Sequence, residues 1–598
     1  MSKAAAHYIS RLNSLQIEKK KLEKLVFFLF LLRLVLFIGT IALIYWFIKT
    51  NSNIWVGLLS GFSFISFLIT VIANQRVNSQ SIQIDNRIRV NENEQKYLAY
   101  SFKHFYNGVE LKGINPELAD DFDLFGEGSV FQYINRTITS NGAKRLANKI
   151  CHWIKDKSAI EQKQEAIAEL QSKVDLMESF QSLGMEIKES GNEIQNLRDW
   201  FESPKVIGKK ERILLFLYPL VFVLTTILIV LSVVGGGIII APIVFTFFIL
   251  SLYKKQVDSA HSKLGRSAKL FEKYSTLMQL MERESFDSPY LNTLQKSFHV
   301  DGSRASISIK KLFVLLNRFD FRFNFVVNIL FNSSLLFELQ VLRQLEQWKG
   351  KHEPIVNNWF DALWEMDALI SFARFAFNNQ ENVSFPTVQK QPFCLSAKSI
   401  GHPIIPINVR IGNDVDFYGQ PKVIVVTGAN MAGKSTFLRT IAVNLILAHN
   451  GAPVCAREFK FTPCDIVSSI NIHDSLSQNE SYFYAELLRI RKIIDHIAQN
   501  TNTLVILDEI LRGTNPKDKQ MGSMGLIEKL IQINAFTLIA THDLAIGQME
   551  ETYPNIILNR CFEVELEDEQ LVFDYKLKEG ISKKLNASYL MRKMGIID

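Results

Sequence analysis

The sequence predicts a protein of the α + α/β class, in which apolar helical hairpins and an α-helical middle region precede a C-terminal α/β domain. Three observations lead to this prediction. Two pairs of long apolar segments occur in the first half of the chain, and the polar segments around them carry apolar residues at helical spacing. After Pro386 and Pro392 the pattern changes to short apolar runs that are typical of buried strands.

The size and composition of the chain agree with this division. Its 598 residues exceed what one hydrophobic core usually holds, so two or more domains are expected. A hydrophobic content of 47% and a mean hydropathy of +0.08 indicate a soluble body with a few membrane spans. The net charge of +7 fits membrane-flanking lysines as well as nucleic-acid binding. The scattered cysteines, without a CxxC pair, argue against a disulfide framework or a zinc site; they are Cys151, Cys394, Cys455, Cys464 and Cys561.

The first hairpin is predicted within residues 1–100, with spans at about 25–48 and 54–73. Each run is long enough to cross ~30 Å of hydrocarbon at about 1.5 Å per residue. Lysines precede the first span and Arg76 follows the second, which places both ends of the hairpin in the cytoplasm by the positive-inside rule. Arg33 interrupts the first span, where its side chain is expected to reach toward the cytoplasmic headgroups.

A second hairpin is predicted within residues 206–256, with shorter spans at about 213–234 and 238–252. Basic residues again flank it on the cytoplasmic side: Lys209, Lys210, Arg212, Lys254 and Lys255. The chain is therefore predicted to be a multi-pass protein of an inner or cell membrane, with its soluble parts in the cytoplasm. Buried helices of a soluble protein are the alternative for both hairpins.

Two helical regions, 101–205 and 257–389, surround the second hairpin. Separate helices are expected over 267–283, 309–332, 335–348 and 355–377. The apolar stretch 325–337 contains two asparagines and lies between Arg322 and Glu338, so we interpret it as a core helix.

The C-terminal domain, 390–598, contains a glycine-rich loop between a strand and a helix. Val423–Val426 form the strand, and the segment from Gly428 to Thr436 has the GxxxxGK[ST] pattern. Such a loop wraps its backbone N–H groups around phosphates at a helix N-terminus, so the pattern predicts an ATP site with Mg²⁺. Lys434 is expected to reach the terminal phosphates and Ser435 to bind Mg²⁺. The residues predicted to bind the nucleotide are Gly428, Asn430, Met431, Ala432, Gly433, Lys434, Ser435 and Thr436.

Acidic residues and a histidine follow two later strands of the same domain. The strand 503–507 ends in Asp508 and Glu509, and the strand 537–540 is followed by His542. We expect Asp508 to hold Mg²⁺ through water and Glu509 to polarise the attacking water. His542 can contact the γ-phosphate or that water, whereas a lone histidine at a strand end is often a surface residue.

A further helix is predicted to begin at Ser481, with Glu486 in its opening turns. Its N-terminus can present a hydroxyl and backbone N–H groups to phosphate, including phosphate bound by a second subunit. An N-capped surface helix is an equally good interpretation of these residues.

Several motifs in this order resemble the MutS family of DNA mismatch-repair ATPases. The loop 427–436 resembles TGPNMGGKST, 508–515 resembles DEIGRGTS, and 540–542 is similar to the family's ATH. Residues 400–405 resemble the His-Pro segment that precedes the family's ATPase core, and Ser481, Phe483 and Glu486 match its SxFxxE pattern. Weaker resemblance begins near residue 120, with 129–146 similar to the start of the family's helical core.

The resemblance implies an ABC-type P-loop ATPase domain and a homodimer that sandwiches ATP. It implies that Ser481 completes the partner subunit's site, that Glu486 belongs to the same nucleotide site, and that helical levers bind DNA. The candidate DNA-binding residues are Lys310, Lys311, Arg318 and Arg322, for which a solvated helix face is the alternative. Because the chain before residue 120 has no room for mismatch-recognition and connector domains, mismatch recognition itself is not expected.

The leading hypothesis is a membrane-anchored MutS-like ATPase that acts on DNA, together with other repair or membrane proteins. An ABC-type transport ATPase is a second possibility, although the sequence has no LSGGQ-type loop. A membrane-tethered ATP-driven clamp that acts on a non-DNA partner is the third.

Overall fold

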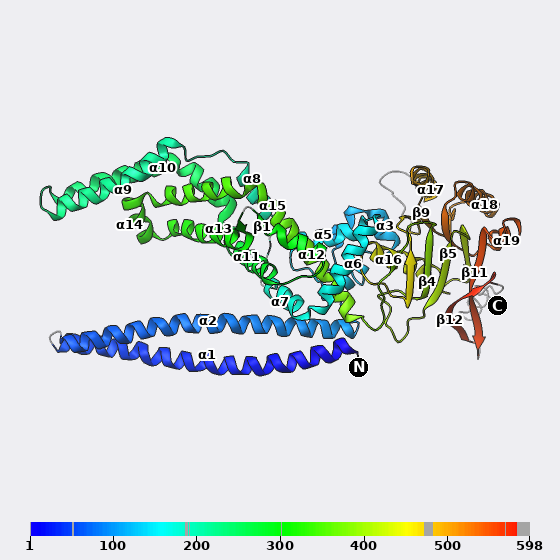
Figure 1. Cartoon of the computed structure of the whole chain (residues 1–598), viewed down its shortest axis with the longest axis horizontal. Helices are drawn as coiled ribbons and strands as arrows, with labels where there is room; N and C mark the ends of the chain where they lie inside the picture. Colours follow the sequence, from blue (N-terminus) through cyan, green and yellow to red (C-terminus); the bar gives the residue numbers. More distant parts are fainter. Residues whose placement is uncertain are drawn as a thin grey trace. The chain divides into compact units, whose positions relative to one another are not determined.

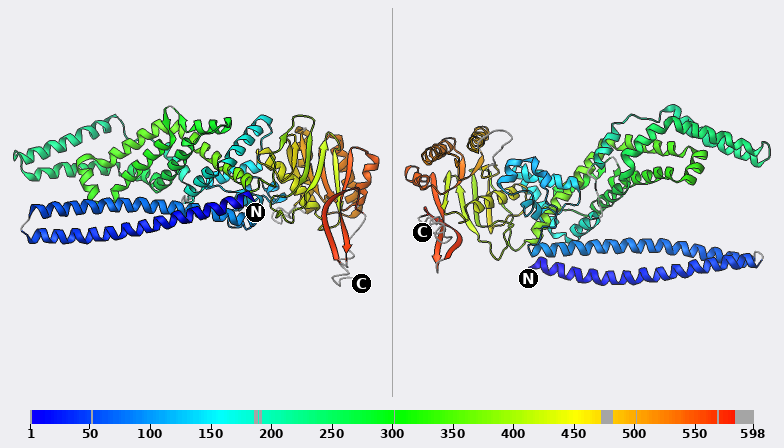
Figure 2. Two further views of the ribbon diagram at one scale, coloured as in Figure 1. Left: turned by 60° about the horizontal axis from the view of Figure 1, so that its bottom comes forward. Right: turned by 180° about the vertical axis from the view of Figure 1, so that it is seen from behind.

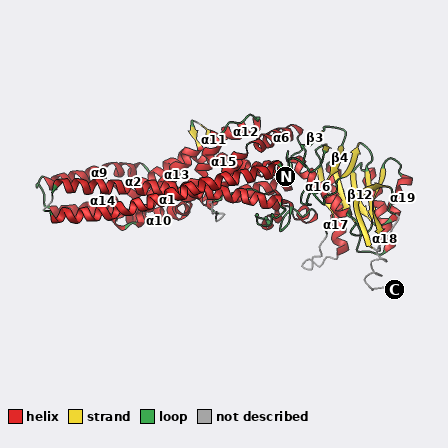
Figure 3. Ribbon diagram, turned by 90° about the horizontal axis from the view of Figure 1, so that it is seen from below, coloured by secondary structure: helices red, strands yellow, loops and turns green. Residues whose placement is uncertain are grey.

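The computed structural model describes residues 2–50, 53–185, 189, 192–300, 302–471, 482–500, 502–567 and 570–582. The chain divides into two compact units. One comprises Met1–Thr137, Ala143–Met177 and Ala368–Asp598, and the other Ile138–Gly142 and Glu178–Asp367. Helices predominate, and the strands of both larger sheets belong to the first unit (Figure 3). The prediction of a mixed helical and sheet protein with apolar helices is confirmed.

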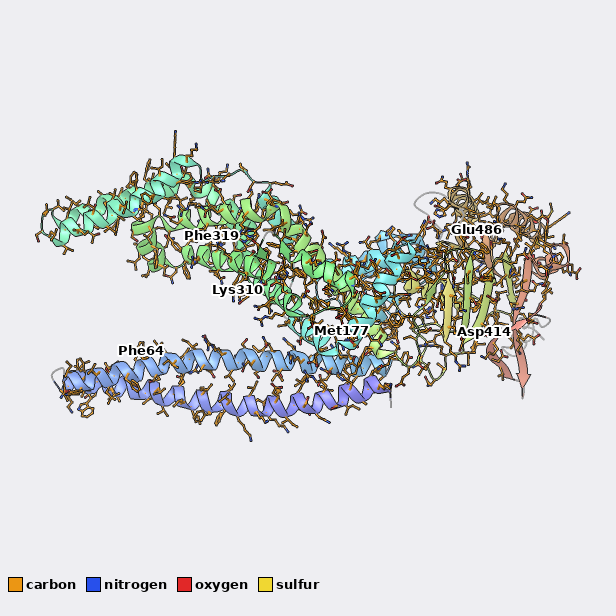
Figure 4. All side chains as sticks on the ribbon, viewed as in Figure 1. Phe64, Met177, Lys310, Phe319, Asp414 and Glu486 are labelled. Atoms are coloured by element: carbon orange, nitrogen blue, oxygen red, sulfur yellow. The ribbon has the colours of Figure 1, made fainter. Side chains whose placement is uncertain are left out.

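Helices α1 (Lys3–Lys49) and α2 (Ile54–Leu98) form a long hairpin in the first unit (Figure 1). In both helices the polar segment continues directly into the apolar run, because neither junction contains a proline or glycine that would end a helix. The two halves of the hairpin differ in burial. Tyr8 and Tyr97 at its base are buried, whereas apolar residues near the turn, such as Phe62 and Phe64 (labelled in Figure 4), are exposed.

A buried ion pair anchors the base of this hairpin to the rest of the first unit. Arg136 donates from Nε to Glu94 Oε1 at 2.6 Å, and its guanidinium lies 3.7 Å from the centroid of the Phe105 ring. Asn378 donates to the other oxygen of Glu94 at 2.7 Å and accepts a hydrogen bond from the Tyr8 hydroxyl at 2.6 Å. Both helices of the hairpin are therefore bonded to the same segment of the chain.

Short helices connect the hairpin to the sheets. They begin or end at polar caps, for example Asn115, whose side chain accepts from the Leu118 N–H at 3.2 Å. These helices are η1 (Val109–Ile114), α3 (Pro116–Asp121), α4 (Val130–Ile134), α5 (Ser140–Cys151), α6 (Lys157–Ser172) and α7 (Val174–Gly184).

The central sheet of the first unit has the strand order β12-β11-β6-β10-β9-β8. All neighbours are parallel except β11 and β12, which form an antiparallel pair. The parallel strands β6, β9 and β10 are buried at every residue, which explains their continuous apolar sequences. The strands are β6 (Val423–Gly428), β8 (Asp465–Ser469), β9 (Thr503–Asp508), β10 (Phe536–Thr541), β11 (Ile557–Glu567) and β12 (Gln570–Glu579).

A second sheet with the order β3-β7-β4-β5 accompanies it, formed by β3 (Thr387–Val388), β4 (Cys394–Ile400), β5 (Asn413–Tyr418) and β7 (Glu458–Phe461). Three helices pack on one face of the central sheet through a shared apolar cluster that includes Ile490, Ile527 and Ile546. They are α17 (Tyr482–Gln499), α18 (Pro516–Gln532) and α19 (Leu544–Thr552). Helix α16 (Lys434–His449) follows β6 and is buried along nearly its whole length. Both views in Figure 2 show these helices around the strands.

The second unit is helical apart from a two-stranded ribbon, β1 (His299–Val300) with β2 (Ser303–Arg304). Its helices α11 and α13 pack against each other, and buried side chains such as Phe319 (labelled in Figure 4) lie between them and their neighbours. The helices are α8 (Glu193–Phe201), α9 (Lys209–Val230), η2 (Gly236–Ile239), α10 (Ile240–Leu264), η3 (Gly265–Ser267), α11 (Ala268–Arg283), α12 (Pro289–Ser297), α13 (Ala305–Asp320), η4 (Phe321–Phe323), α14 (Phe325–Leu335) and the first part of α15 (Phe337–Asn378).

Three helix predictions in this region were wrong. The segment 309–332 is divided between α13, η4 and α14. The segments 335–348 and 355–377 form the single helix α15, which continues through Pro354. The stretch 325–337 is not a core helix, because α14 exposes its large apolar residues; Phe325 is 78% exposed and Leu330 62%. Its buried residues are the polar Asn332 and Ser333.

Within the described residues, four helical segments are long and apolar enough to cross a membrane. They are Lys3–Lys49, Ile54–Leu98, Lys209–Val230 and Gly236–Leu264. They contain the predicted spans 25–48, 54–73 and 238–252, whereas the helix for the predicted span 213–234 ends at Val230. At most 11% of the most apolar 18-residue stretch of each segment is buried in the protein. A fifth segment, α14 with α15, passes the same test but bends by 78° at Leu336.

Replacing Gly142 by alanine is expected to destabilise the second unit by about 1–3 kcal/mol. An added Cβ would overlap the buried Asp367 carboxylate and lie 2.7 Å from Thr139 Oγ1. That carboxylate accepts hydrogen bonds from the N–H and hydroxyl of Thr139 at 3.0 and 2.7 Å, so the overlap disturbs a buried polar group. Thermal unfolding of the purified chain is the measurement. Gly350→Ala is the control, because a Cβ there meets no atom within 4 Å; equal melting temperatures for the two variants would contradict the prediction.

Candidate functional site

The glycine-rich loop lies between β6 and α16, where two glycines have backbone conformations that suit no other residue. Gly428 has φ +153°, and a Cβ there would lie 2.7 Å from the carbonyl oxygen of Phe562. Gly433 has φ +104° and is the N-cap of α16. Met431 between them is 80% exposed, so its side chain points away from the loop. The loop therefore presents backbone groups and the N-terminus of α16, which is an arrangement that binds anions.

Lys434 begins α16 and its ammonium group lies beside the loop. Its Nζ donates to the carbonyl oxygens of Gly428 and Ala429 at 2.7 and 3.0 Å and lies 3.9 Å from Glu509 Oε1. Burial lowers the pKa of Lys434, while the carboxylates of Glu509 and Asp508 act in the opposite direction. The Lys434 ammonium group is thus a buried cation that lies near two acids and donates hydrogen bonds to carbonyl oxygens of the loop. It is therefore available to an incoming phosphate.

Asp508 ends β9 next to Ser435. Burial raises the pKa of Asp508, and a hydrogen bond with the Ser435 side chain partly offsets this effect. The Asp508 Oδ1 atom is buried and has no other partner among the described residues. A hydroxyl and a carboxylate oxygen of this kind fit Mg²⁺, which keeps most of its ligands as water and phosphate oxygens.

Glu509 is surrounded by three basic groups that β9, β10 and α16 bring together. His542 Nδ1 lies 3.3 Å from Glu509 Oε1, and Arg512 Nε lies 3.5 Å from Oε2. The contact between Glu509 and His542 arises because β9 and β10 are adjacent parallel strands and each residue follows the carboxyl end of its strand. Burial alone would raise the pKa of Glu509, but Arg512, His542 and Lys434 outweigh it and hold the pKa below its usual value. Glu509 is therefore ionised at neutral pH.

A cavity of about 510 Å³ opens beside these groups. Its lining includes the polar residues Lys434, Ser435 and Glu509 and the apolar residues Ile400, Ile405, Val409, Ile411, Phe562 and Tyr575. The cavity thus combines charged groups at the loop with apolar side chains, as ligand sites in proteins usually do.

Tyr575 reaches this cavity because β12 is irregular at that point. Glu563 on β11 faces three residues of β12, Asp574 to Lys576, and Tyr575 itself has φ +49°. Asn413 fixes the bulge by donating to the Tyr575 carbonyl at 3.0 Å and accepting from the Leu577 N–H at 2.9 Å. Tyr575 was not predicted from the sequence, since alternation along a strand does not reveal a bulge. A role for Arg512 was likewise not predicted, although the residue lies in the motif 508–515.

Glu486, expected to take part in nucleotide binding, lies outside this cavity. It is buried on α17 (labelled in Figure 4), and its carboxylate accepts from the backbone N–H of Leu511 and Arg512 at 2.5 and 3.1 Å. Leu511 has φ +58°, so Glu486 holds a strained turn that carries Glu509 and Arg512. Ser481, expected to act in a partner's site, lies outside the described residues.

The arrangement as a whole, a parallel sheet whose strand ends carry a glycine-flanked loop, a lysine and two acids, is typical of nucleotide-binding α/β domains. Comparison with known proteins finds similarity in this part of the chain. Residues 424–594 match the family model described as MutS domain V. The chain is also similar to the DNA mismatch repair protein MutS of Ehrlichia ruminantium (strain Gardel), with 30% identity over 267 residues, or 44% of this chain and 32% of that protein.

These matches show that the C-terminal part of the chain is similar to MutS proteins. The similarity spans about a third of the length of the Ehrlichia protein.

Replacing Gly433 by alanine is expected to weaken ATP binding about tenfold or more. Alanine pays about 1–2 kcal/mol at a left-handed backbone position, and its Cβ would lie 3.2 Å from the Tyr575 ring. Equilibrium binding of a fluorescent ATP analogue is the measurement. Gly525→Ala on α18 is the matched control, because a Cβ there meets no atom within 4 Å; unchanged affinity in Gly433→Ala would show that the loop does not bind the nucleotide.

Proposed function

We propose that this protein is a membrane-anchored MutS-like ATPase that binds and hydrolyses ATP as a homodimer and couples this activity to DNA binding. The convergence of Lys434, Asp508, Glu509 and His542 at adjacent strand ends supports ATP hydrolysis most directly. The family match over 424–594 covers all four residues.

The residues of the site have separate tasks in this proposal. The backbone N–H groups of the loop and the N-terminus of α16 bind the phosphates, and Lys434 exchanges its carbonyl partners for phosphate oxygens. The Ser435 hydroxyl and, through water, the Asp508 carboxylate would hold Mg²⁺, which when bound would supply positive charge to the phosphate oxygens. Glu509, kept ionised by its basic neighbours, accepts a proton from the attacking water. His542 and Arg512 orient the Glu509 carboxylate.

The apolar part of the cavity would receive the base of the nucleotide. Tyr575 offers a ring face and the isoleucines an aliphatic wall, which is the kind of surface on which a planar base stacks. The proposal that ATP is the ligand therefore accounts for both the charged and the apolar part of the cavity.

Membrane anchoring is supported by the exposure of the apolar helices. Large apolar side chains cover the outer surfaces of α9, α10 and the distal halves of α1 and α2. Such surfaces have no stable place in water, and basic residues flank each apolar hairpin at the two ends away from its turn, where the chain leads into its polar segments. The ATPase domain accordingly lies in the cytoplasm.

DNA binding is supported by the resemblance and by part of the basic set on α13. Lys310 (labelled in Figure 4), Lys311 and Arg318 are exposed. Arg322 is less accessible and forms an ion pair with Asp258 at 2.6 Å, so we exclude it from the candidate surface. Homodimer formation is proposed because the family resemblance implies an ATP site shared by two subunits. In such a site, Ser481 of one subunit would complete the ATP site of the other.

The test is ATPase activity and binding with duplex, branched and mismatched DNA over a series of salt concentrations. We expect salt-sensitive binding, because phosphate contacts release counterions, and weaker binding when Lys310, Lys311 and Arg318 are all changed to alanine. Lys529→Ala, an exposed lysine on α18, is the control. Indifference to every DNA, with ATP hydrolysis retained, would overturn the DNA part and favour a clamp that acts on a protein or membrane partner.

A further inference from the structure

Helix α14 of the second unit is polar where it is buried and apolar where it is exposed. Asn332 is 1% exposed and Ser333 5%, while Val326 and Leu330 are both 62% exposed. A helix on the surface of a soluble protein has the opposite distribution. Inverted burial of this kind is expected where hydrocarbon replaces water as the surroundings.

The two asparagines on the polar side of α14 are hydrogen-bonded inside the unit, whereas the buried Ser333 Oγ has no hydrogen-bond partner among the described residues. Asn332 donates to Asn328 Oδ1 at 2.7 Å and accepts from the Glu338 N–H at 2.9 Å. Glu338 in turn lies 3.8 Å from Arg322, which pairs with Asp258. Because these groups have partners, the exposed apolar side is a stable feature of the folded unit and does not result from an unfolded segment.

Hydrogen bonds to α9 place α14 at a definite level of the second hairpin. Tyr218 of α9 donates to the Ser333 carbonyl oxygen at 2.6 Å, and Gln340, at the start of α15, donates to the Leu215 carbonyl at 2.8 Å. The apolar run of α9 begins at Ile213. Tyr218 lies five residues after Ile213, which corresponds to a depth of about 7–8 Å along α9 at 1.5 Å per residue. This depth agrees with the burial of about 5–10 Å that is typical of helices in the membrane interface.

The direction and the length of α14 show that this helix does not cross a membrane completely. It bends by 78° away from α15, and Figure 1 shows it turning across the ends of α13 and α15. Its 11 residues measure about 16 Å, roughly half of the hydrocarbon thickness. Helix α15 does not continue the apolar surface, since Leu339, Val341 and Leu342 are buried in the protein.

We propose that α14 is an interfacial helix that lies in the cytoplasmic leaflet beside α9 and α10, with its exposed apolar side against lipid acyl chains. The inference rests on the proposed membrane anchoring by α9 and α10. Helix α14 packs against both α9 and α10, and all three helices expose large apolar side chains, which argues for the same lipid surroundings. Those of α14 are Phe325, Val326, Leu330, Phe331 and Leu335.

The test uses the full chain in vesicles with a bimane label on a single introduced cysteine. Leu330→Cys reports on α14, Val223→Cys on the α9 span, and Lys310→Cys on an exposed position of α13. All five native cysteines are buried, so the unsubstituted chain measures the background labelling. We expect brominated acyl chains to quench the label at position 330 to the same extent as at position 223, and to leave the label at position 310 unchanged. Aqueous iodide should quench the label at position 310 and leave the labels at positions 330 and 223 unchanged.

Three results would overturn the inference. If iodide quenches the label at position 330 while brominated lipid quenches the label at position 223, α14 lies in water and the proposed membrane anchoring by α9 and α10 is still correct. Protection from both quenchers at 330 would show that protein covers α14. Iodide quenching at both 330 and 223 would refute the anchor itself and with it the role of α14. Val326→Cys is the second reporter if Leu330→Cys does not fold.

Discussion

Changing Glu509 to glutamine is expected to leave ATP binding intact and to slow hydrolysis by about two orders of magnitude or more, the usual contribution of a general base. Glutamine keeps the shape of the side chain but cannot accept the proton of the attacking water. The basic groups of His542 and Arg512 lie 3.3 and 3.5 Å from the carboxylate and keep it ionised, so the charge itself is the property that the variant loses.

The measurement is single-turnover ATP hydrolysis next to equilibrium ATP binding. Glu551→Gln is the matched control, because Glu551 is exposed on α19 of the same domain. Normal turnover in Glu509→Gln would remove Glu509 from the proposed chemistry. Loss of ATP binding in this variant would instead show that the carboxylate holds the loop in place through Lys434.

Changing Arg136 to methionine is expected to destabilise the base of the first hairpin by about 3–5 kcal/mol, because it leaves the Glu94 carboxylate buried without its cation. The side chains of Arg136 and Glu94 are only 3% and 2% exposed. The guanidinium also packs on the rings of Phe105 and Tyr97, so the loss includes ring contacts.

Lys103→Met is the control for this second variant, since Lys103 and Glu127 form an ion pair whose side chains are 72% and 66% exposed. Such surface pairs contribute about 0–1 kcal/mol. Thermal unfolding and limited proteolysis near residue 100 are the measurements. If Arg136→Met and Lys103→Met unfold at the same temperature, the buried pair does not anchor the hairpin.

The sequence predicts the helices and strands best where a pattern has one physical explanation. Val423–Val426 and 503–507 are continuous apolar runs followed by chemistry-bearing residues, and both are buried parallel strands. Helix α14 shows the limit of this reasoning. Periodicity reveals that Asn328 and Asn332 share a face, but it does not tell whether protein or lipid faces the other side.

The candidate site was predictable to a similar degree. Asp508, Glu509 and His542 lie together because parallel strands end at one edge of a sheet, a rule that applies before any coordinates are known. The neighbours that position them were not predictable. Tyr575 arrives through a bulge, and Glu486 acts on a turn at Leu511 whose left-handed conformation the sequence conceals.

Under the proposed membrane anchoring, the unbroken course of α2 sets a distance between the bilayer and the sheets of the first unit. Beyond the predicted span, the helix continues from Asn74 to Leu98 without interruption, which corresponds to about 37 Å at 1.5 Å per residue. A helix paired along its length with α1 is a stiff rod, unlike a glycine-serine tether. In a chain anchored in this way, the sheets of the first unit would stand at a constant height above the bilayer, and a binding partner would have to come to that layer.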